Sequence, residues 1–346
     1  MLVVLGAAGT AVGQSSAPVE PDADAVFPKL ALRGFADVTF SSTDRPGVRD
    51  GFGLGQFVLH LSAPLGNKVS FFAETTFTAR TGDFAVEVER VSLKYDVNDR
   101  LKISAGRFHT PVNYWNTAFH HGLWLQTTIS RPEMIRGGGV FQPVHLVGIL
   151  AEGLVSSPTL GLGYNVGVGN GRDSTISRGG DAGDVNPNRA LIAKVYARPA
   201  SLYGVEFGGS AYRDMITTGA ASRLNERILS AYLALTRETP EIIAEFADVH
   251  HTDDATRLEY GSRAFYAQAA YRAEAHPRWK PYYRFETLVA DAGDPVFRDI
   301  GVTISTAGIR FELTGYSALK VEYRHERHDP DDVRSHGVFM QAAWTF

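Results

Sequence analysis

Four histidines gather around one segment of the chain, and imidazole is a common ligand for zinc, copper and nickel. His109, His120 and His121 fall within residues 109 to 139, and His145 follows closely. Adjacent His120 and His121 cannot easily face one ion, because successive side chains of an extended backbone point to opposite sides. No spacing among the four matches a known zinc motif. We therefore expect pore-lining polar residues here, with no metal site and no cofactor.

The same segment is cationic. Arg107, Arg131 and Arg136 lie in or beside it, and Glu133 is the only carboxylate between residues 109 and 139. Rings of arginine or lysine in a narrow passage favour anions. Arg136 and Glu133 could instead pair as neighbours on a short helical turn. The segment contains no lysine.

Residues 109 to 139 also carry too much apolar surface to lie in water, including Tyr114, Trp115, Phe119 and Trp124. A connection of about thirty residues without a strand pattern is usually functional. We predict that it folds against the inside of a barrel as a constriction loop. The candidate constriction residues are Arg107, Tyr114, Trp115, His120, His121, Arg131, Glu133 and Arg136.

Charged side chains recur on one face of several later segments. Lys320, Glu322 and Arg324 alternate with Leu319, Val321 and Tyr323, the pattern of a strand with one greasy and one charged side. Burying so many charges would be costly, so we expect them to line a water-filled lumen. The candidate lumen wall comprises Arg284, Glu286, Arg310, Glu312, Lys320, Glu322 and Arg324.

A catalytic set is harder to assemble. Ser210, Asp248 and His250 could form a hydrolase triad, but nothing in their spacing fixes them together. An enzyme acting on lipid would need such a triad on the lipid face of the barrel. We expect no enzymatic activity, and a lipid-acting barrel enzyme is kept as an alternative.

The elements that position these residues are about sixteen runs of alternating apolar and polar residues, typical of a transmembrane antiparallel β-barrel. No apolar run approaches the roughly 18 residues that a membrane-spanning helix needs. Short connections with turn-forming residues alternate with longer polar ones. The long insert falls between the fifth and sixth expected strands, which makes it the third external loop. The expected strands lie near residues 29–41, 52–63, 69–80, 84–96, 101–108, 143–155, 159–169, 189–198, 204–215, 226–237, 241–251, 263–274, 280–290, 301–313, 318–328 and 336–346.

Composition narrows the function classes. The formal net charge of −4 and the lack of a basic stripe argue against a nucleic-acid partner. The absence of cysteine excludes disulfides and thiolate sites. Residues 1–13 are apolar and end in small residues, which predicts the remnant of a secretory signal peptide. Residues 14–28 read as a disordered acidic leader, and residues 29–346 as the barrel.

Several stretches resemble outer-membrane porins, in particular the phosphate-selective porin (O and P) superfamily. They are the strand LGLGYNVGVGNG, the triplet Gly106-Arg107-Phe108 before a long third loop, and Tyr282-x-Arg284-x-Glu286. The terminal Phe346 is similar to the aromatic signal for barrel insertion. The resemblance implies a 16-stranded barrel in the bacterial outer membrane, often a homotrimer, with its third loop folded inward. Its expected partners are outer-membrane lipid and small hydrophilic solutes or ions.

The expected function is passive diffusion of small hydrophilic solutes, with a weak anion preference. A barrel plugged by its loop that binds one ligand or metal is a second alternative. Gly161, Gly163, Gly167 and Gly169 share one face of a single strand. Glycine weakens a strand unless another backbone must come close. We therefore expect the 109 to 139 insert to lie on this glycine face.

Overall fold

In the computed structural model, the runs of alternating apolar and polar residues form the strands of one closed sheet. The structure describes residues 28–45, 47–119, 122–136, 141–172, 176, 180–217, 223–297, 300–329 and 331–346. The expected signal remnant (1–13) and nearly all of the expected leader (14–28) lie outside these residues and stay predictions. Within them the chain forms sixteen antiparallel strands, each paired with its sequence neighbours. They are β1 (Ala31–Thr43), β2 (Gly51–Pro64), β3 (Val69–Ala79), β4 (Phe84–Asn98), β5 (Leu101–His109), β6 (His145–Leu154), β7 (Leu162–Asn170), β8 (Ala190–Ala197), β9 (Val205–Thr217), β10 (Arg223–Thr236), β11 (Glu241–Asp253), β12 (Glu259–Ala270), β13 (Trp279–Val289), β14 (Val302–Thr314), β15 (Ser317–His328) and β16 (Val333–Thr345).

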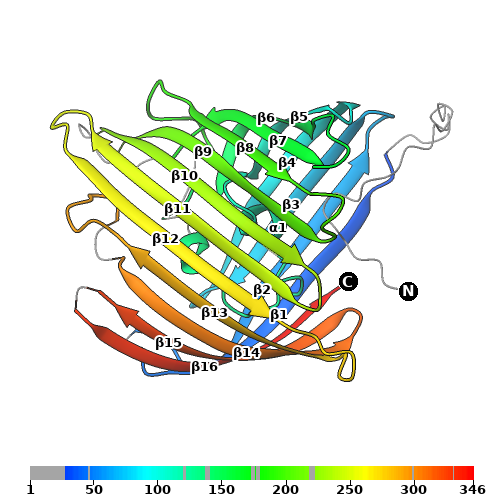
Figure 1. The fold of residues 1–346 in the computed structure, drawn as a ribbon, viewed down its shortest axis with the longest axis vertical. Coiled ribbons are helices and arrows are strands. Elements are labelled where there is room, and N and C mark those ends of the chain that lie inside the picture. Colours follow the sequence, from blue (N-terminus) through cyan, green and yellow to red (C-terminus); the bar gives the residue numbers. More distant parts are fainter. Residues whose placement is uncertain are drawn as a thin grey trace.

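The first and last strands close the barrel (Figure 1). β1 pairs with β16 from Phe35 opposite Thr345 to Thr43 opposite Gly337. Beyond this ladder, Gly34 and Phe346 exchange two backbone hydrogen bonds of 2.9 and 3.1 Å. Closure leaves no open sheet edge, which a bilayer requires because unpaired backbone groups are costly in hydrocarbon. The predicted all-β barrel is confirmed.

The two faces of the strands point as predicted. Leu319, Val321 and Tyr323 on β15 are exposed on the outside, whereas Lys320 and Glu322 are buried on the inside. An apolar outer band with a polar interior is the arrangement of barrels in lipid. No helix among the described residues has the length and apolar character to cross a bilayer.

The connections distinguish the two ends of the barrel. The three longest, residues 110–144, 171–189 and 290–301, all emerge at one end, here called the long-loop end. The opposite end of the barrel, which includes the two-residue turns 99–100 and 315–316, is called the short-turn end. The predicted regular alternation of lengths is only partly right, since 80–83 at the long-loop end is shorter than 155–161 at the short-turn end. The exceptional connection is 110–144, called the third loop.

Candidate functional site

The third loop leaves β5 and returns to β6 through a narrow neck. The backbone N–H of Thr110 donates to the carbonyl of Val144 at 2.8 Å. The side-chain amide of Asn116 donates to the carbonyl of Thr110 at 2.8 Å and to that of Val144 at 3.0 Å. Beyond the neck the loop contains a one-turn helix α1 (Trp115–Ala118) and a 3-10 turn η1 (Glu133–Ile135). These hydrogen bonds hold the two ends of the third loop together where it joins β5 and β6.

The start of α1 is held by two strands of the inner wall. Glu245 on β11 accepts hydrogen bonds from the backbone N–H groups of Tyr114 (2.9 Å) and Trp115 (2.6 Å). Lys194 on β8 donates to the carbonyl of Asn113 at 2.7 Å. The first N–H groups of a helix have no partner within it, so a carboxylate supplied by the wall satisfies them.

The middle of the loop rests on cations from β14 and β15. The Lys320 ammonium donates to the carbonyl oxygens of Gln126 (2.9 Å) and Thr128 (3.1 Å), and also to that of Leu123. The Arg310 guanidinium donates to the same Gln126 carbonyl at 2.9 Å. These loop carbonyls have lost water, and hydrogen bonds from charged donors replace it.

The next stretch of loop is clamped from two sides. Arg284 on β13 donates to the Ser130 carbonyl (2.9 Å), the Ser130 hydroxyl (2.7 Å) and the Arg131 carbonyl (3.2 Å). Glu322 on β15 accepts from the Ser130 hydroxyl (2.6 Å) and from the backbone N–H of Ile129 (2.9 Å). The Arg284 guanidinium thus satisfies acceptors of the loop, and the Glu322 carboxylate satisfies donors of the same stretch.

These contacts correct the expected role of the charged wall. Arg284 and Glu322 are 0 % exposed and Lys320 is 1 % exposed, so the expectation that this wall meets water is wrong for them. Glu286 and Arg310 are buried as well. The strand pattern gives the inward direction correctly, but the third loop covers the wall.

The other two predicted wall residues pair along their own strands. Glu312 accepts from Arg310 at 2.7 Å on β14. Arg324 pairs with Glu322 at 3.2 Å and with Glu326 at 3.1 Å on β15. Neither Glu312 nor Arg324 contacts the loop through these bonds.

The apolar residues of the third loop pack inside the barrel as predicted, but the apolar wall residues that they meet were not predicted. Trp115 and Val112 from the loop, both 0 % exposed, belong to one buried cluster with Phe108, Leu146 and Ile192 from the wall. Inward alternation on β6 and β8 places apolar residues where a wet lumen would need polar ones. The apolar residues at those inward positions were the sequence signal that could have predicted the cluster.

The glycine face of β7 does point inward, but the loop is not what lies closest to it. A methyl group added to Gly167 would first meet the side chains of Ile192 and Leu150, and one on Gly169 would meet Leu146 and the backbone of Val147. The prediction that the loop lies directly on these glycines is therefore wrong. They make room for side chains of the neighbouring strands.

One predicted constriction residue crosses the interior. The backbone of Arg131 is held by Arg284 on β13, while its side chain reaches the Gln56 carboxamide oxygen on β2 at 3.4 Å. Burial lowers the pKa of the Arg131 guanidinium, against the attraction of the Glu89 and Glu74 carboxylates. The loop therefore points a cation at the β1 to β4 wall.

On that wall the carboxylates are buried beneath their cationic partners. Glu74 is bound by Arg90 and by His60 at 2.9 Å. Glu74 is 1 % exposed, whereas the side chains of Arg90 and His60 are 27 % and 22 % exposed. The groups that water and solutes meet here are consequently N–H donors.

The predicted histidines divide into two groups. The rings of His109 and His145 lie 5.3 Å apart at the neck of the loop. His145 faces Glu89 at 2.9 Å, and His109 lies 3.8 Å from Glu74. His120 and His121 lie outside the described residues. In the described part of the chain, no group of three acidic or histidine side chains could hold a metal ion.

The remaining candidates lie at the edges of the loop. Arg107 donates to Asp181 of the 171–189 connection at 2.8 Å and lies 3.7 Å from Glu89. Arg136 pairs with Glu133 at 3.1 Å across η1, which is the simple neighbour pairing weighed above. The assignment of all these residues to a constriction stays a prediction.

The residues of the candidate hydrolase triad are separated by the sheet. Ser210 points inward and contacts the Ser230 hydroxyl. His250 and Asp248 are hydrogen-bonded at 2.7 Å, and both alternate with the inward residues of β11. The serine and the histidine therefore face opposite sides of the wall, and this triad cannot form.

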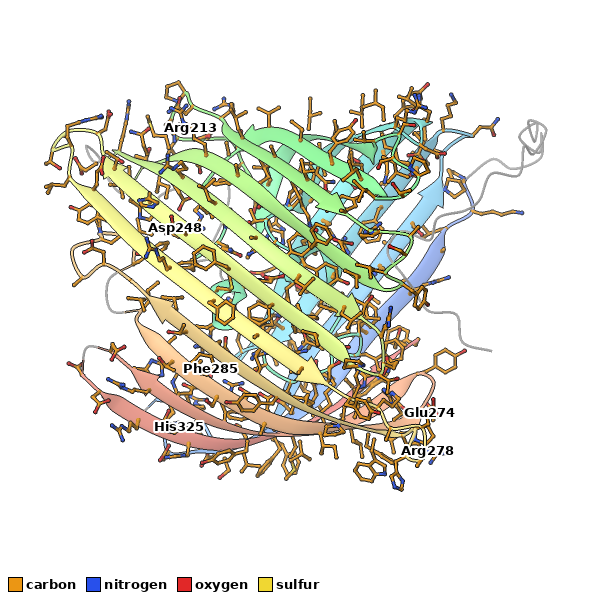
Figure 2. All side chains as sticks on the ribbon, in the orientation of Figure 1. Arg213, Asp248, Glu274, Arg278, Phe285 and His325 are labelled. Carbon is orange, nitrogen blue, oxygen red and sulfur yellow. The ribbon has the colours of Figure 1, made fainter. Side chains whose placement is uncertain are left out.

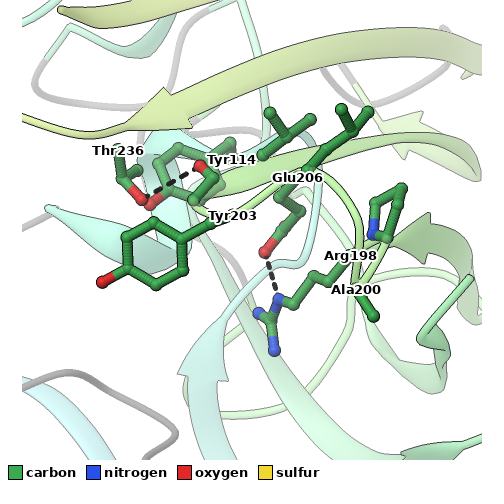
Figure 3. Close-up of a pocket in the computed structure, with 10 residues that line it drawn as sticks. Tyr114, Arg198, Ala200, Tyr203, Glu206 and Thr236 are labelled. Carbon is green, nitrogen blue, oxygen red and sulfur yellow. Dashed lines mark hydrogen bonds and ion pairs between the residues drawn. The ribbon is translucent and has the colours of Figure 1, made fainter. Parts of the chain in front are cut away.

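A cavity of about 260 Å³ lies between Tyr114 of the third loop and the connection from β8 to β9 at the short-turn end (Figure 3). Arg198 donates to Glu206 at 2.6 Å beside it, and Tyr114 contributes its ring. Burial, followed by the Glu206 carboxylate, raises the pKa of the Tyr114 phenol, which therefore stays protonated. The cavity is lined by Tyr114, Arg198, Pro199, Ala200, Leu202, Tyr203, Gly204, Val205, Glu206 and Thr236.

No protein-family model matches the sequence, and comparison with curated proteins gives no match. Solved structures do match. An anion-selective porin from Comamonas acidovorans aligns at a TM-score of 0.68 and 12% identity, over 92% of this chain and 100% of that one. The outer-membrane channel DcaP of Acinetobacter baumannii gives 0.62 and 13%, over 92% and 97%. A trimer form of OmpT, an outer-membrane protein of Vibrio cholerae, gives 0.61 and 12%, over 92% and 99%. The chain therefore has the 16-stranded barrel fold of outer-membrane porins.

Proposed function

We propose that this protein is a porin of the bacterial outer membrane that lets small hydrophilic solutes diffuse passively, with a preference for anions, and that it catalyses no reaction. The observation that carries the proposal is the third loop, held across the interior by wall side chains. The fold shared with an anion-selective porin supports it. The anion preference is supported by Arg90, whose side chain is 27 % exposed whereas the Glu74 carboxylate that it binds is 1 % exposed. It is also supported by Arg131, whose guanidinium crosses the interior to reach Gln56 on β2.

Planar-bilayer recording tests the proposal. Stepwise conductance increases are expected on insertion, with a reversal potential in a salt gradient that indicates chloride over potassium. Arg90→Gln and Arg131→Gln should each move the reversal potential towards cation preference. Arg278→Gln, at an exposed turn of the short-turn end, is the matched control and should leave it unchanged. A folded barrel that inserts without conductance contradicts the porin function.

A barrel closed by its loop that binds one ligand is the competing function. The cavity beside Tyr114 favours it, because that cavity is lined by residues of both the third loop and the wall. Silence in the bilayer together with saturable binding of a small solute would decide for this alternative.

Assembly as a homotrimer is a further part of the proposal. A trimer form of a protein with this fold supports it. The mass of the detergent-solubilised protein, measured by light scattering, distinguishes one copy from three. Membership of the phosphate-selective porin superfamily stays a prediction.

A further inference from the structure

Two arginine pairs lie on the outer wall of the barrel, each made of residues directly opposite on adjacent strands. Arg327 on β15 is opposite Arg334 on β16, and Arg213 on β9 is opposite Arg227 on β10. All four alternate with inward-facing residues, so their side chains point towards the membrane side. Like charges directly opposite on neighbouring strands repel. An anion placed between the two guanidinium groups of a pair relieves this repulsion.

The first pair has its anion within the chain. Asp332 accepts from Arg327 at 2.6 Å and from Arg334 at 3.2 Å, and Asp329 lies 3.6 Å from Arg327. One carboxylate thus bridges both guanidinium groups. This pair shows how the molecule neutralises two opposed arginines.

Among the described residues, the second pair has no such carboxylate. Across the described residues, no acidic side chain lies within 4.0 Å of Arg213 or Arg227, and the undescribed connection 218–222 contains no acidic residue. The nearest outward acid along the sheet is Asp248, but Arg263 (2.8 Å) and His250 (2.7 Å) already occupy it. Arg213 and Arg227 are both exposed.

The position of the pair along β9 and β10 relates it to the edge of the apolar outer band, and Arg213 is labelled in Figure 2. Arg213 lies four residues before the end of β9 and Arg227 four residues after the start of β10, which at the usual rise and tilt is about 10 Å from the strand ends. Below Arg227 the outward positions of β10 become Leu229 and Leu233, both exposed. The pair therefore lies where an apolar band gives way to a polar one, at the long-loop end.

We propose that Arg213 and Arg227 bind the phosphate group of a membrane lipid in the leaflet at the long-loop end. A phosphate offers several acceptor oxygens on one anionic group, and arginine presents a planar fork that matches it. It would take the bridging place that Asp332 takes between Arg327 and Arg334. The site requires only a barrel in a membrane, not conduction.

Native mass spectrometry of the intact, detergent-solubilised chain tests the proposal, with lipid A carrying two phosphates as the probe. The double variant Arg213→Gln/Arg227→Gln should lower its affinity about tenfold or more, because charge-assisted hydrogen bonds are lost. The double variant Arg327→Gln/Arg334→Gln is the matched control, and it should stay within about twofold of the parent. Phosphatidylcholine, which carries no net charge, should bind weakly and equally to all three proteins.

Two results would overturn the proposal. One is unchanged lipid A affinity in the Arg213→Gln/Arg227→Gln variant. The other is a change in the number of chains per particle instead of a change in lipid binding, which would make this surface a contact between copies. The single variant Arg227→Gln guards against a folding defect, since it removes the repulsion while keeping Arg213. It should bind lipid A more weakly yet unfold no earlier than the parent.

Discussion

Replacing Arg284 by methionine should free part of the third loop and widen the passage. Arg284 donates four hydrogen bonds to loop atoms of residues 128–131 and pairs with Glu286 at 3.0 Å. Its removal takes the Arg284 donor from the Arg131 carbonyl and leaves the Ser130 carbonyl with the Thr128 hydroxyl as its donor, at 2.8 Å. Removing one partner from a buried, hydrogen-bonded ion pair costs about 3–5 kcal/mol. We assign most of this cost to loop attachment, because the backbone ladder of the barrel is unchanged.

A loss of about 4 kcal/mol shifts a local attachment equilibrium by roughly a thousandfold. Single-channel recording should then show larger steps or frequent transitions between two levels, and larger polyethylene glycols should enter. Lys320 and Arg310 continue to hold the segment up to residue 128, so the expected change is local. Arg324→Met is the matched control, since Arg324 is an inward arginine whose bonds go to wall carboxylates.

The reasoning would be refuted by a correctly folded Arg284→Met protein with the conductance, noise and polymer cut-off of the parent. Folding is checked by the change in gel mobility on heating. Ser130→Ala, alone and combined with Arg284→Met, completes a double-mutant cycle. We expect a coupling of about 1–2 kcal/mol between the two residues, because the Ser130 hydroxyl contacts Arg284 directly.

Two further perturbations follow from the site. Trp115→Ala should destabilise the folded protein by about 3–5 kcal/mol, because the indole is completely buried. Denaturant unfolding measures this loss of stability. A loss below about 1 kcal/mol would mean that the loop is not packed as described. Glu238, in the turn after β10, titrates with a lowered pKa because Lys280 and Arg272 outweigh the effect of burial. Its contribution to stability is therefore present above its unfolded pKa of about 4.3 and is lost as the pH falls through its lowered, folded-state pKa. Glu238→Gln should consequently reduce the dependence of the thermal-unfolding temperature on pH between about pH 5 and pH 3. An unchanged pH dependence would contradict this.

The strands were predictable because a membrane barrel imposes a period of two on every one of them. The outward Leu319 and inward Lys320 follow from that period alone, and each expected strand lies within a few residues of an observed one. The closing pair, β1 with β16, follows from the even strand number. The register of Phe35 with Thr345 does not, since many registers satisfy the same alternation.

The fate of the inner charges was not predictable from local pattern. Lys320 and Gln126 meet across nearly two hundred residues, and no periodicity connects them. A physical signal was nevertheless present. A long connection without strand partners carries many backbone donors and acceptors, and once it folds inward each of them needs a partner. Charged side chains such as Arg284 and Glu322 on the covering wall are the available ones.

The wall binds mainly the backbone of the third loop, and this affects which loop residues can change without loss of the fold. Lys320, Arg310 and Glu245 hold peptide groups, which every residue except proline supplies in full. Loop side chains that face the open passage can therefore be exchanged without loosening the attachment. A library that randomises the water-facing positions of this segment should yield folded variants with new permeability far more often than one that randomises the wall.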